Sequence, residues 1–104
     1  MTKVKALLEK MRSAQAVLER LERGENPTEE DLNGAPLLNY WTVIAHGRFL
    51  VLQGQVTGHP KLADNDFIET SAVVWLAPDR TTARTLSRFY RLGAPWEDLL
   101  KTHH

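Results

Sequence analysis

The 104 residues include no cysteine. Disulfide bonds and cysteine-ligated zinc sites are therefore excluded, and a cytoplasmic location is the simpler expectation. Long hydrophobic runs are missing too. The longest, FLVL at 49–52 and AVVWLA at 72–77, fall far short of the roughly 20 apolar residues that a transmembrane helix needs. We therefore expect no membrane partner.

The sequence also lacks an excess of charge of either sign, because 13 basic and 13 acidic residues balance. Dedicated DNA-binding domains are usually strongly basic, so this balance argues against that class. The length and a hydrophobic content of 42% are typical of one globular domain with one modest core, spanning 1–104. The last two residues, His103 and His104, are either native or the remains of a purification tag, and we assign them no function.

The strongest periodic signal lies near the N-terminus. Apolar residues recur at steps of three and four along 3–23, and charged residues fill most of the other positions. This pattern predicts an amphipathic helix that Gly24 ends. Its apolar stripe is expected to pack on the following sheet, or to pair two chains as a short coiled coil in a homodimer. The residues expected to face the sheet are Leu7, Met11, Leu18 and Leu21.

The segment 26–36 connects this helix to the strand-rich part of the chain. Thr28 is a typical N-cap, three acidic residues come directly after it, and Asn33-Gly34 is a typical stop. These signals predict a helix of about one turn.

From residue 37 the pattern changes to aromatic and β-branched residues, which favour strands. Strands are expected at 38–45, 48–57 and 67–77, with a hairpin turn at 45–48 and a further turn at Pro78-Asp79. Residues 80–93 fit either a helix or a fourth strand. The expected fold is α+β: a long N-terminal amphipathic helix packed on a small antiparallel β-sheet meander of three to four strands over 37–92, with a short C-terminal helix at 95–101 whose Trp96, Leu99 and Leu100 face inward.

The stretch GQVTGHPKLADNDFIETS, 54–71, concentrates reactive side chains between two predicted strands. His59 with Asp64, Asp66 and Glu69 offers metal ligands, but the spacing matches neither an EF-hand nor a zinc motif. His59 with Thr70 or Ser71 offers a nucleophilic arrangement, but the serine lies in no nucleophile elbow. We therefore expect no catalytic residue, metal or cofactor here, and keep a small hydrolase-like or metal-dependent enzyme centred on His59 as an alternative. The expected role is a structural turn, made by Gly58, His59, Pro60, Asp64 and Asp66.

Several short motifs between 54 and 93 occur together: Gly58-His59-Pro60, Thr70-Ser71, Arg84-Thr85 and Tyr90 to Gly93. In this combination the stretch resembles a group of small uncharacterised proteobacterial proteins, known only as a domain of unknown function. The resemblance implies a bacterial protein and no particular activity. It also favours a strand over a helix for 82–92. Together with the small size, it leaves an inhibitor carried by a phage or another mobile element as an alternative.

Arginines are spaced along 80–91 with two aromatic residues among them. Arginine and tyrosine are enriched where proteins bind one another, and arginines beside aromatic rings also suit single-stranded nucleic acid. A solvated face, neutralised by the acidic segment 25–31, is the third interpretation. In a single strand, alternation would place Arg84, Leu86, Arg88, Tyr90 and Leu92 on one side.

We therefore expect a small non-catalytic binding or regulatory protein that acts through a protein partner. A nucleic-acid-binding module that uses the segment 80–91 is the alternative. The expected binding residues are Arg84, Arg88, Tyr90 and Arg91.

Overall fold

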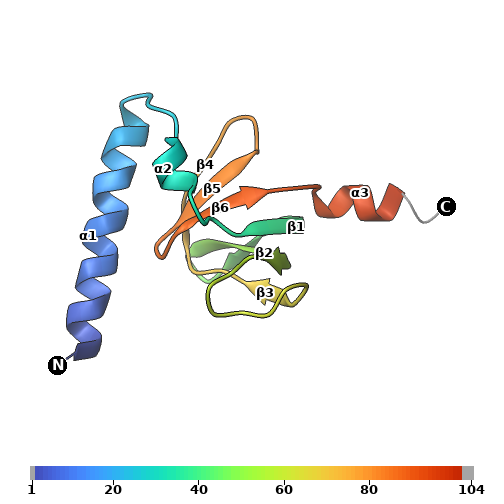
Figure 1. Ribbon diagram of the computed structural model, residues 1–104, viewed down its shortest axis with the longest axis horizontal. Helices are drawn as coiled ribbons and strands as arrows, with labels where there is room; N and C mark the ends of the chain where they lie inside the picture. The colour runs from blue at the N-terminus through green and yellow to red at the C-terminus, as the bar shows by residue number, and fades with distance from the viewer. Residues whose placement is uncertain (1, 102–104) are drawn as a thin grey trace.

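The computed structural model describes residues 2–101, and Figure 1 shows their arrangement. In this range the fold is α+β, with helices at both ends of the chain, as predicted. His103 and His104 lie outside the described residues. The elements are α1 (Thr2–Glu22), α2 (Glu29–Leu32), β1 (Leu37–His46), β2 (Phe49–Thr57), β3 (Phe67–Glu69), β4 (Val73–Leu76), β5 (Thr82–Thr85), β6 (Phe89–Leu92) and α3 (Trp96–Lys101).

The residues predicted to end the first helix, to cap the second and to form the hairpin turn have these roles in the structure. Gly24 ends α1 with φ 89°, and Gly47 turns the β1–β2 hairpin with φ 63°. Positive φ carries little penalty for glycine, which has no Cβ. Thr28 caps α2 reciprocally: the Asp31 amide donates to Thr28 Oγ1 (3.0 Å), and the Thr28 amide donates to Asp31 Oδ2 (2.9 Å). These signals are local in the chain, so they could be predicted from sequence.

The sheet is not the predicted antiparallel meander of three to four strands. Its six strands lie in the order β3-β2-β1-β6-β5-β4, and β1 pairs with β6 in parallel. The predicted strand 67–77 is divided into β3 and β4, which occupy opposite edges of the sheet. The predicted strand 82–92 is also divided, into the hairpin partners β5 and β6. The sheet is therefore mixed, with more strands than expected.

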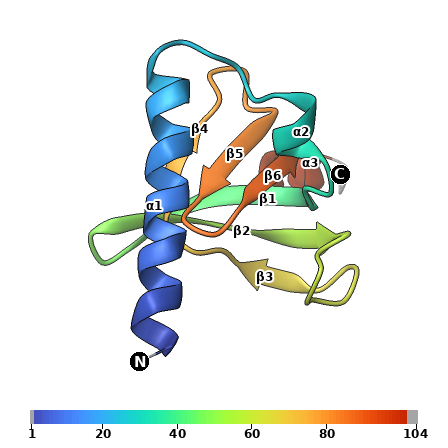
Figure 2. The same ribbon diagram turned by 60° about the vertical axis from the view of Figure 1, so that its left-hand side comes forward.

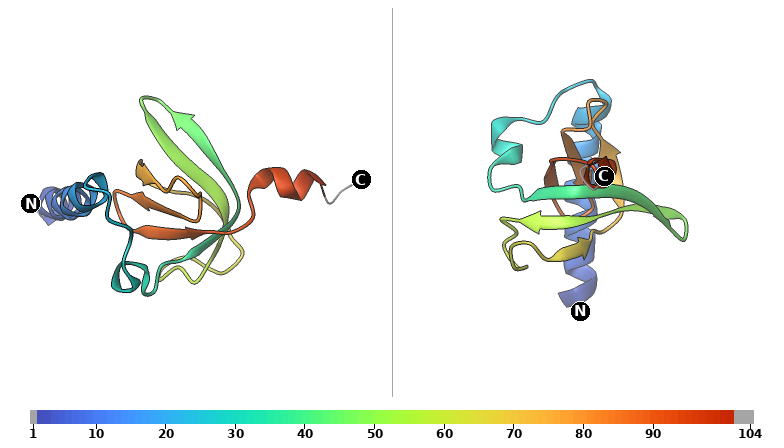
Figure 3. Two further views of the ribbon diagram at one scale, coloured as in Figure 1. Left: turned by 90° about the horizontal axis from the view of Figure 1, so that it is seen from above. Right: turned by 90° about the vertical axis from the view of Figure 1, so that its right-hand side faces the viewer.

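The link between β3 and β4 requires a curved sheet. Only residues 70–72 separate the two edge strands, and this length of extended chain spans at most about 14 Å. The edges must therefore approach each other at this end, and the two views in Figure 3 show the curvature of the sheet. Thr70 fixes the crossing, because its amide donates to the Leu52 carbonyl (2.8 Å) and its Oγ1 accepts from the Leu52 amide (3.0 Å).

The core fills the space between the strands, and a bulge in β1 shapes it. Leu38 and Trp41 are both buried although they are three residues apart, which regular alternation forbids. The β1–β2 register shifts between Asn39 and Thr42, and Tyr40 has φ 52°, so the extra residue turns Trp41 inward. The central cluster consists of Leu38, Trp41, Leu52, Val56, Ala83, Tyr90 and Leu92.

The predicted packing of α1 on the sheet is wrong for its N-terminal half. Ala14 and Leu21 are buried, whereas Val4, Leu7, Leu8 and Met11 are between 45% and 53% exposed. The helix is about 31 Å long, and the nearby strand β4 extends only about 13 Å. In Figure 2 the first turns of α1 extend past the strands. Pairing of this stripe with a second copy stays a prediction.

The C-terminal helix α3 packs beside β1 at the opposite end of the molecule from α1 (Figure 1). Trp96 and Leu100 are exposed, so the expectation that both face inward is wrong. Because α3 follows β6 directly at the end of the sheet, little of the sheet surface is within its reach.

Candidate functional site

The turn between β5 and β6 is fixed by one buried threonine. Thr85 Oγ1 accepts hydrogen bonds from the amides of Ser87 (3.2 Å) and Arg88 (3.3 Å). The Thr85 amide donates to the Arg88 carbonyl (2.9 Å). Thr85 is fully buried, so solvent does not compete for these bonds. The turn therefore holds Ser87 and Arg88 in a defined place at the end of the hairpin.

Arg84 lies on β5 and is almost completely buried, with 7% of its surface exposed. Its guanidinium carbon lies 5.2 Å from the ring centroid of Phe89, its cross-strand partner. Its Nε donates to the Thr85 carbonyl (2.8 Å). Within residues 2–101 Arg84 forms no ion pair, and its two Nη atoms donate no hydrogen bond. Among the described residues no fully buried side-chain nitrogen lacks a hydrogen-bond partner, so these Nη atoms are accessible from the surface. Arg84 is thus a largely buried cation with an accessible tip and without a counter-ion among the described residues.

The surroundings of Arg84 disfavour its charge. Burial lowers the pKa of Arg84, and the nearby Arg20 and Arg88 lower it further, against an opposing effect of Asp31. Arginine nevertheless stays protonated in proteins, so the charge persists at neutral pH. Desolvating an ion without a partner disfavours the folded state.

The carboxylate beside this arginine cluster is already engaged. Asp31 accepts from both Nη atoms of Arg20 (2.9 and 3.1 Å), which joins α2 to α1. Hydrogen bonding from Arg20 is the main cause of the lowered pKa of Asp31. Asp31 therefore acts on Arg84 only through its electrostatic field and not through a hydrogen bond.

A cavity of about 180 Å³ opens between this turn and the segment 31–36. We call it the arginine pocket. Arg84 and Arg88 line it, as does Asn33, which also borders a larger groove beside α2. The residues that line the arginine pocket are Asp31, Asn33, Gly34, Ala35, Pro36, Arg84, Ser87, Arg88 and Phe89.

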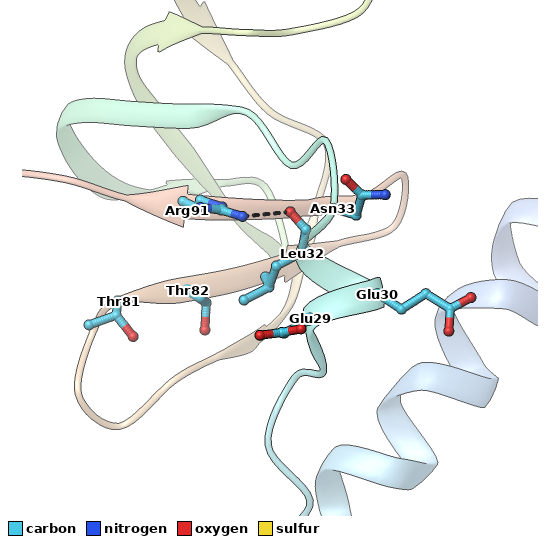
Figure 4. A pocket seen from close by; sticks show the side chains of 7 residues that line it. All are labelled: Glu29, Glu30, Leu32, Asn33, Thr81, Thr82 and Arg91. Atoms are coloured by element: carbon cyan, nitrogen blue, oxygen red, sulfur yellow. Dashed lines mark hydrogen bonds between the residues drawn. The ribbon is translucent and has the colours of Figure 1, made fainter.

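The other two predicted binding residues lie elsewhere. Cross-strand partners share a face, and Tyr90 pairs with Ala83 whereas Phe89 pairs with Arg84. Tyr90 therefore faces the core, and the prediction that Arg84 and Tyr90 share one side was wrong. Arg91 donates from Nη2 to the Leu32 carbonyl (3.0 Å) and anchors α2 beside the larger groove, as Figure 4 shows.

The aromatic residues of the hairpin are covered. Phe89 and Tyr90 are each 4% exposed, and the guanidinium of Arg84 covers the Phe89 ring. Base stacking needs an open ring face. Neither ring offers one to a nucleic acid.

Comparison with known proteins places the chain in a family. Residues 4–102 match the model of a family of unknown function, DUF6634. The chain belongs to this family. The match extends well beyond the motifs at 54–93 that carried the resemblance. No curated protein and no solved structure matches the chain. No helix within residues 2–101 is long and apolar enough to cross a membrane.

The stretch 54–71 contains the end of β2, a loop and β3, and the loop is held by bonds to its own backbone. Asp64 Oδ1 accepts from the Gly58 amide (2.8 Å), and the Asn65 amide donates to the Val56 carbonyl (2.7 Å). The Asp66 carbonyl accepts from the Val56 amide (2.9 Å). Pro60 lies at the exposed tip of this loop. Gly58, Asp64 and Asp66 therefore have contacts that serve the turn.

The catalytic and metal candidates of this stretch are not brought together. Thr70 bonds to Leu52, Ser71 Oγ donates to Ser87 Oγ (3.2 Å), and Glu69 lies 3.1 Å from His46 Nδ1. His59 instead lies against Tyr90, with ring centroids 6.5 Å apart. The part of the chain from 2 to 101 contains no group of three histidine or acidic residues able to hold a metal ion.

Sequence reasoning missed two residues of the arginine pocket region, Arg20 and Ser87, whereas the acidic segment 25–31 that contains Asp31 was expected to neutralise the arginines. Arg20 is far from the hairpin in sequence, so only the tertiary fold reveals its pairing with Asp31. A local signal for the position of Ser87 was present, because a threonine hydroxyl often accepts a hydrogen bond from the backbone amide two residues later in a turn.

We expect His59 to make stability depend on pH. Burial is the main cause of its lowered pKa, with Arg88 and Lys61 adding to it, and its Nδ1 accepts from the Lys61 amide (3.0 Å). The unfolded chain has the ordinary histidine pKa of about 6.5, so acid protonates the unfolded state first. The stabilisation is present above that value and is lost as the pH falls through the lower folded pKa.

The measurement is urea unfolding at about pH 7.5 and at about pH 5, above the range where most carboxylates titrate. His59→Asn keeps a side-chain acceptor and removes the titration. The variant should lose less stability than the wild type on acidification, and equal losses would contradict the assignment.

Proposed function

We propose that this protein is a small, non-catalytic binding protein that acts through protein–protein contacts. Its arginine pocket receives an acidic group of the partner. The observation that carries this proposal is the burial of Arg84 without an ion pair within residues 2–101. From the cysteine-free composition and the resemblance described above, we place the interaction in a bacterial cytoplasm.

The chemistry of the guanidinium group supports an acidic ligand. It is planar, always charged and matched to oxyanions that accept two parallel hydrogen bonds. Nε of Arg84 is used by the Thr85 carbonyl, and both Nη atoms keep their donors for another group. Arg88 lines the same pocket and adds a second guanidinium.

The energetic cost of burying the Arg84 charge also supports an acidic ligand. A largely buried charge without an ion pair disfavours folding, and ionisable groups whose pKa is perturbed by burial and by neighbouring charges gather at functional sites. A ligand that brings the missing negative charge offsets the desolvation that Arg84 suffers in the free protein. The absence of catalysis is supported separately, since His59, Thr70 and Ser71 each bond in a different place.

The test is capture of the partner from a lysate of the source cell on immobilised protein, with and without nuclease. We expect the wild type to capture a protein that resists nuclease treatment. Arg88→Gln should lose it, because the pocket loses one of its two guanidinium groups. Arg48→Gln is the matched control, since Arg48 lies in the β1–β2 turn and outside the pocket.

Retention of the partner by Arg88→Gln would refute the assignment of the pocket. Loss of capture after nuclease treatment would point to nucleic acid instead.

A further inference from the structure

We propose that the acidic group received by the arginine pocket is a phosphorylated side chain of the partner protein. Arg84, Arg88 and Ser87 bind its phosphate. This inference rests on the proposed function and names the ligand of that site.

The balance of charge favours a phosphate over a carboxylate. Arg20 is already paired with Asp31 through two hydrogen bonds and also lies near Glu25 and Glu30, whereas Arg84 and Arg88 line the pocket without an ion pair among the described residues. One carboxylate from a partner would leave the cluster with an excess of positive charge. A phosphomonoester carries about −1.5 to −2 at neutral pH and balances it more completely.

The donors around the pocket approach from more than one element. Arg84 projects from β5, while Ser87 and Arg88 project from the turn that Thr85 fixes. Ser87 Oγ lies 3.2 Å from Ser71 Oγ, and a hydroxyl that accepts one hydrogen bond can donate another to a ligand. Phosphate presents three strong acceptor oxygens in a tetrahedral arrangement, whereas a carboxylate presents two in a plane. The distribution of donors suits the tetrahedral group.

The size of the pocket restricts what enters it. Sites that enclose drug-sized ligands have volumes of about 300–1,000 Å³. The arginine pocket measures about 180 Å³, and among the described residues no open aromatic ring lines it. It accommodates the charged tip of a side chain and not a base with its sugar. A phosphoprotein therefore fits the site better than a nucleotide or an RNA strand does.

The Arg84 side chain and the backbone of the turn are also held in place before any ligand arrives. Arg84 is fixed by the Thr85 carbonyl and by the Phe89 ring, and Thr85 bonds both turn amides. Arg84 therefore has little side-chain freedom to lose on binding. Arginine clusters that recognise phosphorylated motifs are a recurring mode of peptide recognition.

The experiment is a titration of ¹⁵N-labelled protein at constant ionic strength, monitored by NMR. The probes are a short phosphoserine peptide, its unphosphorylated form, and the same peptide with aspartate at that position. We expect saturable shifts of the Ser87 and Arg88 amides and of Arg84 Nε with the phosphopeptide. The aspartate peptide should bind at least about tenfold more weakly, and the unphosphorylated peptide should not bind.

Two variants keep the result interpretable. Arg84→Gln and Arg88→Gln should each weaken the phosphopeptide at least about tenfold, and Arg48→Gln should leave it unchanged. If only one of these two pocket variants folds, the phosphopeptide affinity of the folded variant is the test. Equal affinity for the aspartate peptide would overturn the phosphate assignment and leave the proposed function standing.

Shifts that spread outside the pocket, or that Arg84→Gln and Arg88→Gln leave intact, would also overturn the phosphate assignment. Saturable shifts of the same pocket resonances by a single-stranded RNA, tighter than those by the phosphopeptide, would overturn the choice of a protein partner.

Discussion

Replacement of Trp41 by alanine is expected to lower the free energy of unfolding by about 3–5 kcal/mol. Trp41 belongs to the central cluster and is 5% exposed. Its indole Nε1 donates to the Gly93 carbonyl (3.0 Å), so one side chain joins the β1 bulge to the end of β6. The alanine variant leaves a cavity and an unpaired carbonyl together.

Urea unfolding monitored by circular dichroism measures this loss, with Trp41→Phe as the matched variant. Phenylalanine keeps most of the apolar ring and removes the hydrogen bond, so a smaller loss of about 1–2 kcal/mol is expected. A loss below about 1 kcal/mol for Trp41→Ala would show that the side chain does not anchor the core.

Replacement of Arg84 by methionine is expected to raise the free energy of unfolding by about 1 kcal/mol, although a buried hydrogen bond is removed. The wild-type protein buries the Arg84 charge without an ion pair in residues 2–101. Exchange of buried ionic groups for well-packed apolar ones is often stabilising by about 1–4 kcal/mol. Methionine has a similar length and packs well on an aromatic ring such as Phe89.

Losing the Nε bond to the Thr85 carbonyl offsets part of this gain. The comparison is again urea unfolding, with Arg48→Met as the control at an exposed turn position. A fall in stability of more than about 1 kcal/mol for Arg84→Met would mean that Arg84 serves the fold. A rise in the free energy of unfolding of Arg84→Met would show that the wild-type arginine lowers stability, as is common for residues that serve binding.

The parts of the fold that were predictable are those whose causes lie within a few residues. The apolar period of 3–23 predicted α1, and Thr28 with Asn33-Gly34 predicted α2, because periodicity and capping act locally. The hairpin at Gly47 was predictable for the same reason. The sheet order was not, since nothing near Thr70 in sequence indicates that its partner is Leu52.

For the site, the sequence predicted that Arg84 and Arg88 belong to a binding surface, but not the pocket that they line. Arg84 and Arg88 are four apart, which placed them on one surface under either a helix or a strand. The error over Tyr90 came from treating 82–92 as one strand, because the turn at 86–88 changes which residues face the core. The acidic segment 25–31 was expected to neutralise the arginines of 80–91, and Asp31 does act on Arg84. The ion pair between Asp31 and Arg20 depends on how α1 and α2 meet, so only the structure reveals it.

The most direct test of the arginine pocket is partner capture by Arg84→Met protein, measured beside its unfolding curve. The variant is expected to be at least as stable as the wild type, so loss of capture cannot be attributed to unfolding. We predict that Arg84→Met loses the partner that wild type and Arg48→Met both retain. Capture at the wild-type level by a folded Arg84→Met protein would contradict the account.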